Sequence, residues 1–140
     1  MNGYSGTPLA QKLGITPEMA VVLIRAPTNY RKLLGRIASS VEFSDQIKNA
    51  SNFVHIFTKS RGELEKRLAI LREKVADTGI VWVSWPKKSS GVRTDVTEDV
   101  VRSIALPLGL VDVKVCAIDE TWSGLKLMVR RTNRKVPAKT

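Results

Sequence analysis

The sequence predicts an α/β fold, a three-layer sandwich in which helices cover both faces of a mainly parallel sheet with an antiparallel C-terminal edge. Continuous apolar, β-branched runs at 19–24 and 79–85 are typical of strands that are buried on both faces. Each run is followed by a helical pattern, and this alternation indicates parallel strands joined by crossover helices. The last two strand-like runs are separated by a turn too short for a crossover, so they must pair antiparallel.

The first part of the chain predicts a short helix and then a strand–helix unit. Thr7 and Pro8 are typical of the start of a helix, and Gly14 is typical of its end. The predicted helix between Pro8 and Gly14 has the sequence LAQKL. The strand MAVVLI at 19–24 leads through Thr28-Asn29 to a second helix. One face of that helix is apolar and consists of Tyr30, Leu33, Leu34 and Ile37.

The second unit is the strand FVHIF at 53–57 followed by a long helix. Ser60 and Glu63 form a capping box that predicts where this helix begins. Its apolar stripe consists of Leu64, Leu68, Leu71 and Val75. Between the two units the pattern is weaker: VEF at 41–43 favours a short strand, and DQIKNASN a loop or a helical turn.

The third unit is the strand GIVWVSW at 79–85, the basic loop PKKSSGVRTD and a helix. Asp95 and Glu98 have the spacing of a second capping box. The core face of the helix consists of Val100, Val101, Ile104, Ala105 and Leu108. Two strands, 110–118 and 124–131, then flank the turn DETWS and form the antiparallel edge.

Length and charge predict one domain, residues 1–131, followed by a basic disordered tail, residues 132–140. The net charge is +10, but the last fifteen residues carry six basic and no acidic side chains. The body of the chain is therefore only moderately basic. A single cysteine excludes an internal disulfide framework and favours a reducing compartment. With no leader pattern and no long apolar run, we expect a cytoplasmic protein without membrane contact.

The basic loop is the first candidate site. Lys87, Lys88, Ser89, Ser90 and Arg93 offer ammonium groups, hydroxyls and a guanidinium, which suit a phosphate or a carboxylate. The helix that follows already has carboxylates in its first turn, and these disfavour an anion at its N-terminus. An anionic ligand would therefore rest on the side chains of the loop.

The turn between the last two strands is the second candidate. Asp119, Glu120, Trp122 and Ser123 follow a strand that we expect to run parallel to 79–85, so this turn and the basic loop share one edge of the sheet. Two arrangements stay open. The acids pair with the basic loop and fix it, or the two segments line a pocket with Trp122 as its apolar wall.

The remaining chemical groups predict no catalytic or metal site. His55, the one histidine, lies inside an apolar strand and is expected to be a hydrogen-bonded core or edge residue. Cys116 is expected to be an inert buried thiol. Ser84 and Lys87 spell S-x-x-K, but Ser84 lies in a strand and not on the helical turn that this mechanism needs. With one histidine and one cysteine, a zinc site is not expected.

Three long blocks of the chain resemble a family of small bacterial proteins catalogued as a domain of unknown function. The blocks are GYSGTPLAQKLGI, WVSWPKKSSGV and TEDVVRSIALPLGLVDVKVCAIDETWSGLKLMVRR. The resemblance implies a Rossmann-like fold, distantly similar to class I S-adenosylmethionine-dependent methyltransferases, and no established activity. Those enzymes place a glycine-rich turn after the first strand, where this chain has Ala26 and Pro27, and Gly35 comes too late. Glu42 or Asp45 would be the acid on the following strand.

These observations favour a binding module over an enzyme. The leading hypothesis is that the 86–95 loop holds a small anionic ligand or an acidic protein surface, with no cofactor predicted. One alternative is a methyltransferase-like enzyme that uses S-adenosylmethionine despite its missing glycines. The other is a protein that associates weakly and non-specifically with nucleic acid through its basic tail.

Overall fold

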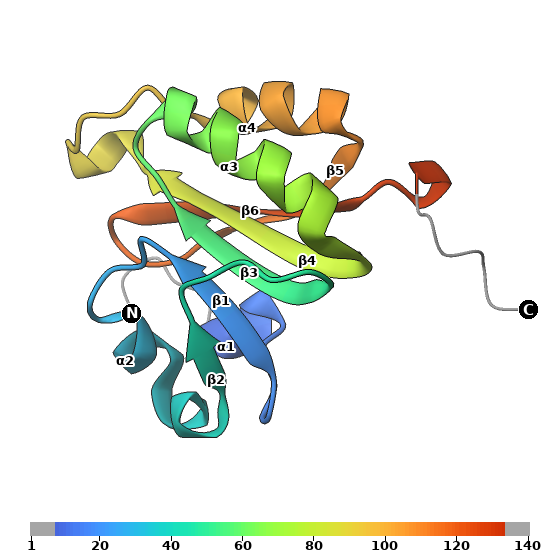
Figure 1. The fold of residues 1–140 in the computed structure, drawn as a ribbon. Helices are drawn as coiled ribbons and strands as arrows, with labels where there is room; N and C mark the ends of the chain where they lie inside the picture. The colour runs from blue at the N-terminus through green and yellow to red at the C-terminus, as the bar shows by residue number, and fades with distance from the viewer. Residues whose placement is uncertain (1–7, 134–140) are drawn as a thin grey trace, which may run out of the picture.

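A computed structural model describes residues 8–133 and shows one six-stranded sheet between two layers of helices (Figure 1). The strand order is β2-β1-β3-β4-β6-β5. The first four strands pair parallel, and β6 runs antiparallel to both of its neighbours. The α/β class, the mainly parallel sheet and its antiparallel C-terminal edge are therefore confirmed. Of the predicted tail at 132–140, residues 132 and 133 belong to a 3₁₀ turn, and residues 134–140 lie outside the described residues, as does Thr7.

The strands and helices follow the predicted order along the chain. The strands are β1 (Ala20–Ile24), β2 (Glu42–Ser44), β3 (Ser51–Phe57), β4 (Val75–Pro86), β5 (Leu110–Ala117) and β6 (Trp122–Val129). The α-helices are α1 (Leu9–Leu13), α2 (Tyr30–Leu34), α3 (Arg61–Lys74) and α4 (Glu98–Ala105). Short 3₁₀ turns are η1 (Gly35–Ser40), η2 (Lys88–Ser90), η3 (Leu106–Leu108) and η4 (Arg131–Asn133).

Two apolar cores lie on opposite faces of the sheet. Helices α3 and α4 cover one face, and α1 and α2 cover the other (Figure 1). The first core includes Leu64, Leu68 and Leu71 of α3, all with no exposed surface, as predicted. Val75, the fourth residue of the predicted stripe, is also buried but begins β4 and does not belong to the helix. The second core is aromatic and centres on Tyr30, Phe53, Phe57 and Trp82. Alternate residues of β3 and β4 supply the two cores because successive strand side chains point to opposite faces.

The start of α3 was predicted correctly, whereas the start of α4 was predicted two residues too early. The hydroxyl of Ser60 accepts a hydrogen bond from the backbone N–H of Glu63 at 3.2 Å. At α4 the cap is Thr97, which accepts from the backbone N–H of Val100, and not Asp95. Asp95 instead accepts the backbone N–H of Arg61 at 2.7 Å, so it caps the neighbouring helix. Asp95 is therefore a helix cap, but it caps α3 through a tertiary contact and not α4 through a local one.

Two strands are longer than their apolar runs because neighbouring strands continue alongside them. Strand β4 reaches Pro86, which pairs with Trp122, so β6 begins at Trp122 and not at the predicted 124. Inside β6, a Cβ on Gly124 would meet Ile118 at 3.0 Å and Ser84 at 3.2 Å. This glycine therefore allows β5, β4 and β6 to pack closely at the strand ends. Among residues 8–133, none of the helices has the length and apolarity needed to cross a bilayer.

Candidate functional site

The candidate site lies where the sheet reverses its winding, at the carboxyl ends of β1 and β3. From β1 the chain crosses to β2 on one side, and from β3 it crosses to β4 on the other, through helices on opposite faces. In open α/β sheets such a switch point leaves a crevice between the two diverging connections. Two cavities flank this point, and Arg25, the first residue after β1, lines both.

The larger of these two cavities, here called the β1–β2 cavity, has a volume of about 500 Å³. It is lined by Leu23, Arg25, Ala26, Pro27, Thr28, Tyr30, Arg31, Phe43, Ser44 and Asp45. The guanidinium of Arg31 lies over the ring of Phe43, 4.6 Å from its centroid, so one wall is aromatic and cationic. The cavity therefore combines a carboxylate, two guanidinium groups and apolar walls.

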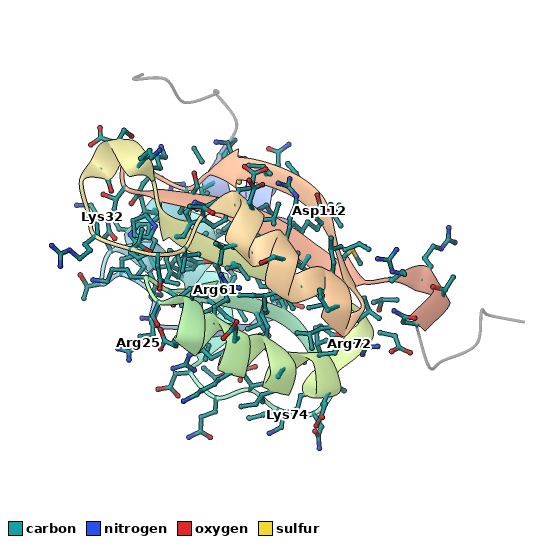
Figure 2. All side chains as sticks on the ribbon, turned by 90° about the horizontal axis from the view of Figure 1, so that it is seen from above. Arg25, Lys32, Arg61, Arg72, Lys74 and Asp112 are labelled. Carbon is teal, nitrogen blue, oxygen red and sulfur yellow. The ribbon has the colours of Figure 1, made fainter. Side chains whose placement is uncertain are left out.

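The backbone after β1 is strained at this cavity. Arg25 has a φ of 60°, in the left-handed region that glycine adopts without cost and other residues rarely occupy. The turn therefore adopts at one residue a conformation typical of glycine, although the chain has no glycine there. Arg25 donates from Nε to Glu63 at 3.0 Å, which ties the turn after β1 to helix α3. In Figure 2, Arg25 lies near one end of α3 and Arg72 near the other.

A buried polar chain begins at Tyr30, which lines the same cavity. The hydroxyl of Tyr30 and Nδ1 of His55 share a hydrogen bond of 2.8 Å, and Nε2 of His55 shares another of 2.8 Å with Ser84. His55 has no exposed surface, and burial lowers the pKa of its imidazole to about 3, so the ring is neutral. Burial also raises the pKa of Tyr30. The prediction of a hydrogen-bonded core histidine is confirmed.

The second cavity, here called the β3 cavity, has a volume of about 410 Å³. Its lining residues are Arg25, Phe57, Thr58, Lys59, Ser60, Glu63 and Trp122. Trp122 is half-buried, and its ring meets that of Phe57 edge to face with the centroids 5.0 Å apart. The predicted aromatic wall therefore exists, but it faces the end of β3, and no residue of 87–93 lines this cavity.

The basic loop and the acidic turn are neighbours, as the parallel strands require. The backbone N–H of Lys87 donates to the carbonyl of Thr121 at 2.7 Å. The two segments mostly satisfy their own polar groups: Ser90 donates to the carbonyl of Lys87, and Asp119 accepts the backbone N–H groups of Thr121 and Trp122. The other predicted site residues of these segments, Lys88, Ser89, Arg93, Glu120 and Ser123, are exposed or half-exposed.

The C-terminal end of the basic loop is held against the loop after β3. Thr94 donates from its hydroxyl to the carbonyl of Lys59 at 2.7 Å, and Asp95 N–H donates to the same carbonyl at 3.3 Å. Together with the bond from Arg61 to Asp95, these contacts fix the loop on the start of α3. Part of the sequence PKKSSGVRTD is therefore structural, while Lys88 and Arg93 extend toward solvent.

Sequence reasoning missed Arg25 as a site residue and did not choose between Glu42, in β2, and Asp45, just after it. The structure separates them, because Asp45 lines the β1–β2 cavity whereas Glu42 lines a different one. Arg25 carries no pattern of its own, but its place immediately after a buried strand was a usable signal. Cys116 is half-buried and not fully buried as expected, and burial raises the pKa of its thiol. Within 8–133 no group of three potential metal ligands occurs.

Comparison with known structures gives a consistent likeness to methyltransferases. A SAM-dependent methyltransferase from Aquifex aeolicus matches with a TM-score of 0.60 and 14% identity over 86% of this chain and 87% of that one. Magnesium protoporphyrin IX methyltransferase from Synechocystis PCC 6803, with SAH bound, gives 0.58 and 9% over 86% and 77%. The DhpI–SAH complex gives 0.60 and 12% over 89% and 83%. No protein-family model matches the chain, and no curated protein does.

At these identities the likeness shows the fold alone. The chain has a Rossmann-like fold similar to that of SAM-dependent methyltransferases. Because the neighbours are enzymes, the expectation that this chain is not an enzyme stays a prediction, and so does the absence of a cofactor.

Proposed function

We propose that the protein binds a nucleoside with an anionic tail, of the S-adenosylhomocysteine class, in the β1–β2 cavity. The observation that carries this proposal is that Asp45 and Arg25 both line one cavity at the switch point of the sheet. A carboxylate accepts two hydrogen bonds from the hydroxyls of a ribose diol, as in dinucleotide-binding folds. A guanidinium binds the carboxylate of the tail.

The size and walls of the cavity support a nucleoside. A volume of about 500 Å³ lies within the range of small-molecule sites, roughly 300–1,000 Å³. Phe43, stacked under the guanidinium of Arg31, provides a flat wall for a base. The cavity therefore offers a separate contact for each part of the ligand: base, diol and tail.

S-adenosylmethionine fits the cavity less well than S-adenosylhomocysteine. The lining holds two guanidinium groups, Arg25 and Arg31, against one carboxylate, so the positive sulfonium of adenosylmethionine is disfavoured. The turn after β1 offers few backbone donors for the tail, because Pro27 has no N–H. Arg25 also carries a Cβ where a glycine would allow closer approach. The residues therefore fit the nucleoside and the anion better than the methyl donor.

Calorimetry with S-adenosylhomocysteine, S-adenosylmethionine and adenosine tests the proposal. We expect the affinity to fall in that order. Asp45→Asn should weaken adenosylhomocysteine binding about ten-fold, the value of one charge-assisted contact. Glu42→Gln is the matched control, since it removes a carboxylate three residues away, at the start of β2, that lines another cavity. Absence of binding at millimolar concentration, or equal effects of both variants, would contradict the proposal.

Methyl transfer is the second candidate function, and the likeness to methyltransferases favours it. Adenosylmethionine, when bound, supplies an electrophilic methyl group to an acceptor. Incubation of the purified protein with methyl-labelled adenosylmethionine and a cell extract tests this directly. Label transfer that Asp45→Asn abolishes and Glu42→Gln preserves would establish the enzyme.

The predictions about the partner remain open. An acidic protein surface or a small anion at Lys88 and Arg93 would depend on exposed side chains that the structure leaves accessible. Non-specific nucleic-acid binding concerns the predicted tail, residues 132–140. Deleting residues 132–140 should then reduce DNA binding and its dependence on salt.

A further inference from the structure

We propose that the β3 cavity is a second binding site, one that takes a small aromatic anion such as an aryl carboxylate or an aryl phosphate. It adjoins the nucleoside site and goes beyond the proposed function. The two cavities share Arg25, but their other lining residues differ. The proposed ligand of the β3 cavity has two chemical features, an aromatic ring and a negative charge, and a separate set of contacts supports each.

The preference for an aromatic ring comes from Trp122 and Phe57. The two rings meet edge to face, and both line the cavity. The backbone of Trp122 is held in place: its backbone N–H donates to Asp119 at 2.8 Å, and its carbonyl accepts from the backbone N–H of Ile118 at 2.9 Å. With the backbone held and the ring packed against Phe57, the wall offers a flat apolar group an aromatic contact at a low cost in conformational freedom.

The preference for negative charge comes from Lys59 and Arg25. The one acid of the lining, Glu63, is already satisfied by three partners: Arg25 at 3.0 Å, Arg67 at 3.2 Å and the hydroxyl of Thr58 at 2.9 Å. Although burial raises the pKa of Glu63, these hydrogen bonds outweigh burial and hold the pKa below its ordinary value. Arg25 uses one of its five N–H donors on Glu63, so others are available to a ligand.

The positions of the three tryptophans provide a specific reporter. Trp82 has no exposed surface and Trp85 is 6% exposed, whereas Trp122 is half-buried and lines the cavity. Quenching by a dissolved ion therefore reports mainly on Trp122. We expect iodide to quench the wild-type fluorescence more than caesium does, because the surroundings of Trp122 are positive. Trp122→Phe should remove this difference.

Ligand binding is tested with benzoate and phenyl phosphate, and with benzylamine as the cation of similar size. Benzoate and phenyl phosphate should change the Trp122 fluorescence at saturable concentrations, and benzylamine should not. Lys59→Gln should weaken benzoate binding about ten-fold, as expected for loss of one charged partner. Lys66→Gln is the matched control, since Lys66 is also an exposed lysine, on the adjoining helix α3, but does not line the cavity.

The two proposals fail in different ways. Asp45→Asn should leave benzoate binding unchanged, so benzoate binding in a protein that does not bind adenosylhomocysteine still supports the second site. If benzylamine binds as well as benzoate, or if Lys59→Gln and Lys66→Gln behave alike, the inference is wrong. It is also wrong if iodide and caesium quench the wild type equally.

Discussion

The turn after β1 (residues 25–29) and the loop after β4 (residues 87–95) leave the same edge of the sheet but are built differently. The first has the sequence RAPTN, is strained at Arg25 and is followed by Tyr30, which begins the buried chain through His55 to Ser84. The second is rich in lysine and serine and is held by surface hydrogen bonds. The cavity nevertheless lies at the first. Amino-acid composition pointed to the 87–95 loop as an anion-binding segment, whereas the topology of the sheet determined where a cavity forms.

The largest expected effect concerns the buried support of the first turn. His55→Ala should destabilise the protein by about 4 kcal/mol, because it leaves a cavity and two buried hydroxyls without their partner. Chemical denaturation at pH 7 measures this change. Ser84→Ala, which leaves the bond between Tyr30 and His55 intact, should cost clearly less. Equal losses would show that the bond to Tyr30 contributes little.

The same histidine makes stability depend on pH. Burial lowers the pKa of His55 from 6.5 to about 3. Below pH 6.5 the imidazole therefore binds a proton in the unfolded chain but stays neutral in the folded chain. The contribution of His55 to the free energy of unfolding is fully present above pH 6.5 and is lost as the pH decreases below it. Between pH 7 and pH 5 the loss should be about 2 kcal/mol. His55 is the one histidine, so His55→Asn should remove most of this slope in denaturation curves.

The strain at Arg25 should appear as a difference between two substitutions. Arg25→Gly and Arg25→Ala both remove the exposed ion pair with Glu63, but glycine accepts a φ of 60° and alanine does not. The glycine variant should therefore be more stable than the alanine variant by about 1 kcal/mol. Thermal melts of the two proteins compare them directly. An advantage for alanine would mean that the turn is not held in the left-handed region.

Asp95 tests whether the end of the second loop is structural. Asp95→Ala should cost about 1 kcal/mol, typical of a lost helix cap, because the N–H of Arg61 then has no protein acceptor. Asp99→Ala is the matched control, since the side chain of Asp99 is 98% exposed on α4. Denaturation curves that shift equally for both variants would argue against the cap.

The smallest effect is expected at the exposed part of the second loop. The double variant Lys88→Ala/Arg93→Ala should change the free energy of unfolding by no more than about 0.5 kcal/mol. It should also leave adenosylhomocysteine binding unchanged, since neither residue lines the β1–β2 cavity. A clear loss of affinity for adenosylhomocysteine in calorimetry would indicate that the ligand binds at this loop.

The sequence by itself determined the order of the strands and helices, the fold class and much of the core. These features depend on short-range patterns: the stripe from Leu64 to Leu71, the cap at Ser60 and the continuous apolar run at 79–85. The short turn at 119–121 also required antiparallel pairing of the last strands, as found. Such signals lie within a few residues of one another and need no knowledge of the rest of the chain.

Only the tertiary structure decided which residues meet at the crevice. Arg25, Asp45 and Lys59 lie far apart in the sequence, and no local pattern links them. Asp95 caps a helix 34 positions away, and His55 joins Tyr30 to Ser84 across two strands. The physical reason is that strand order sets where connections diverge, and the order β2-β1-β3 depends on the packing of the whole sheet.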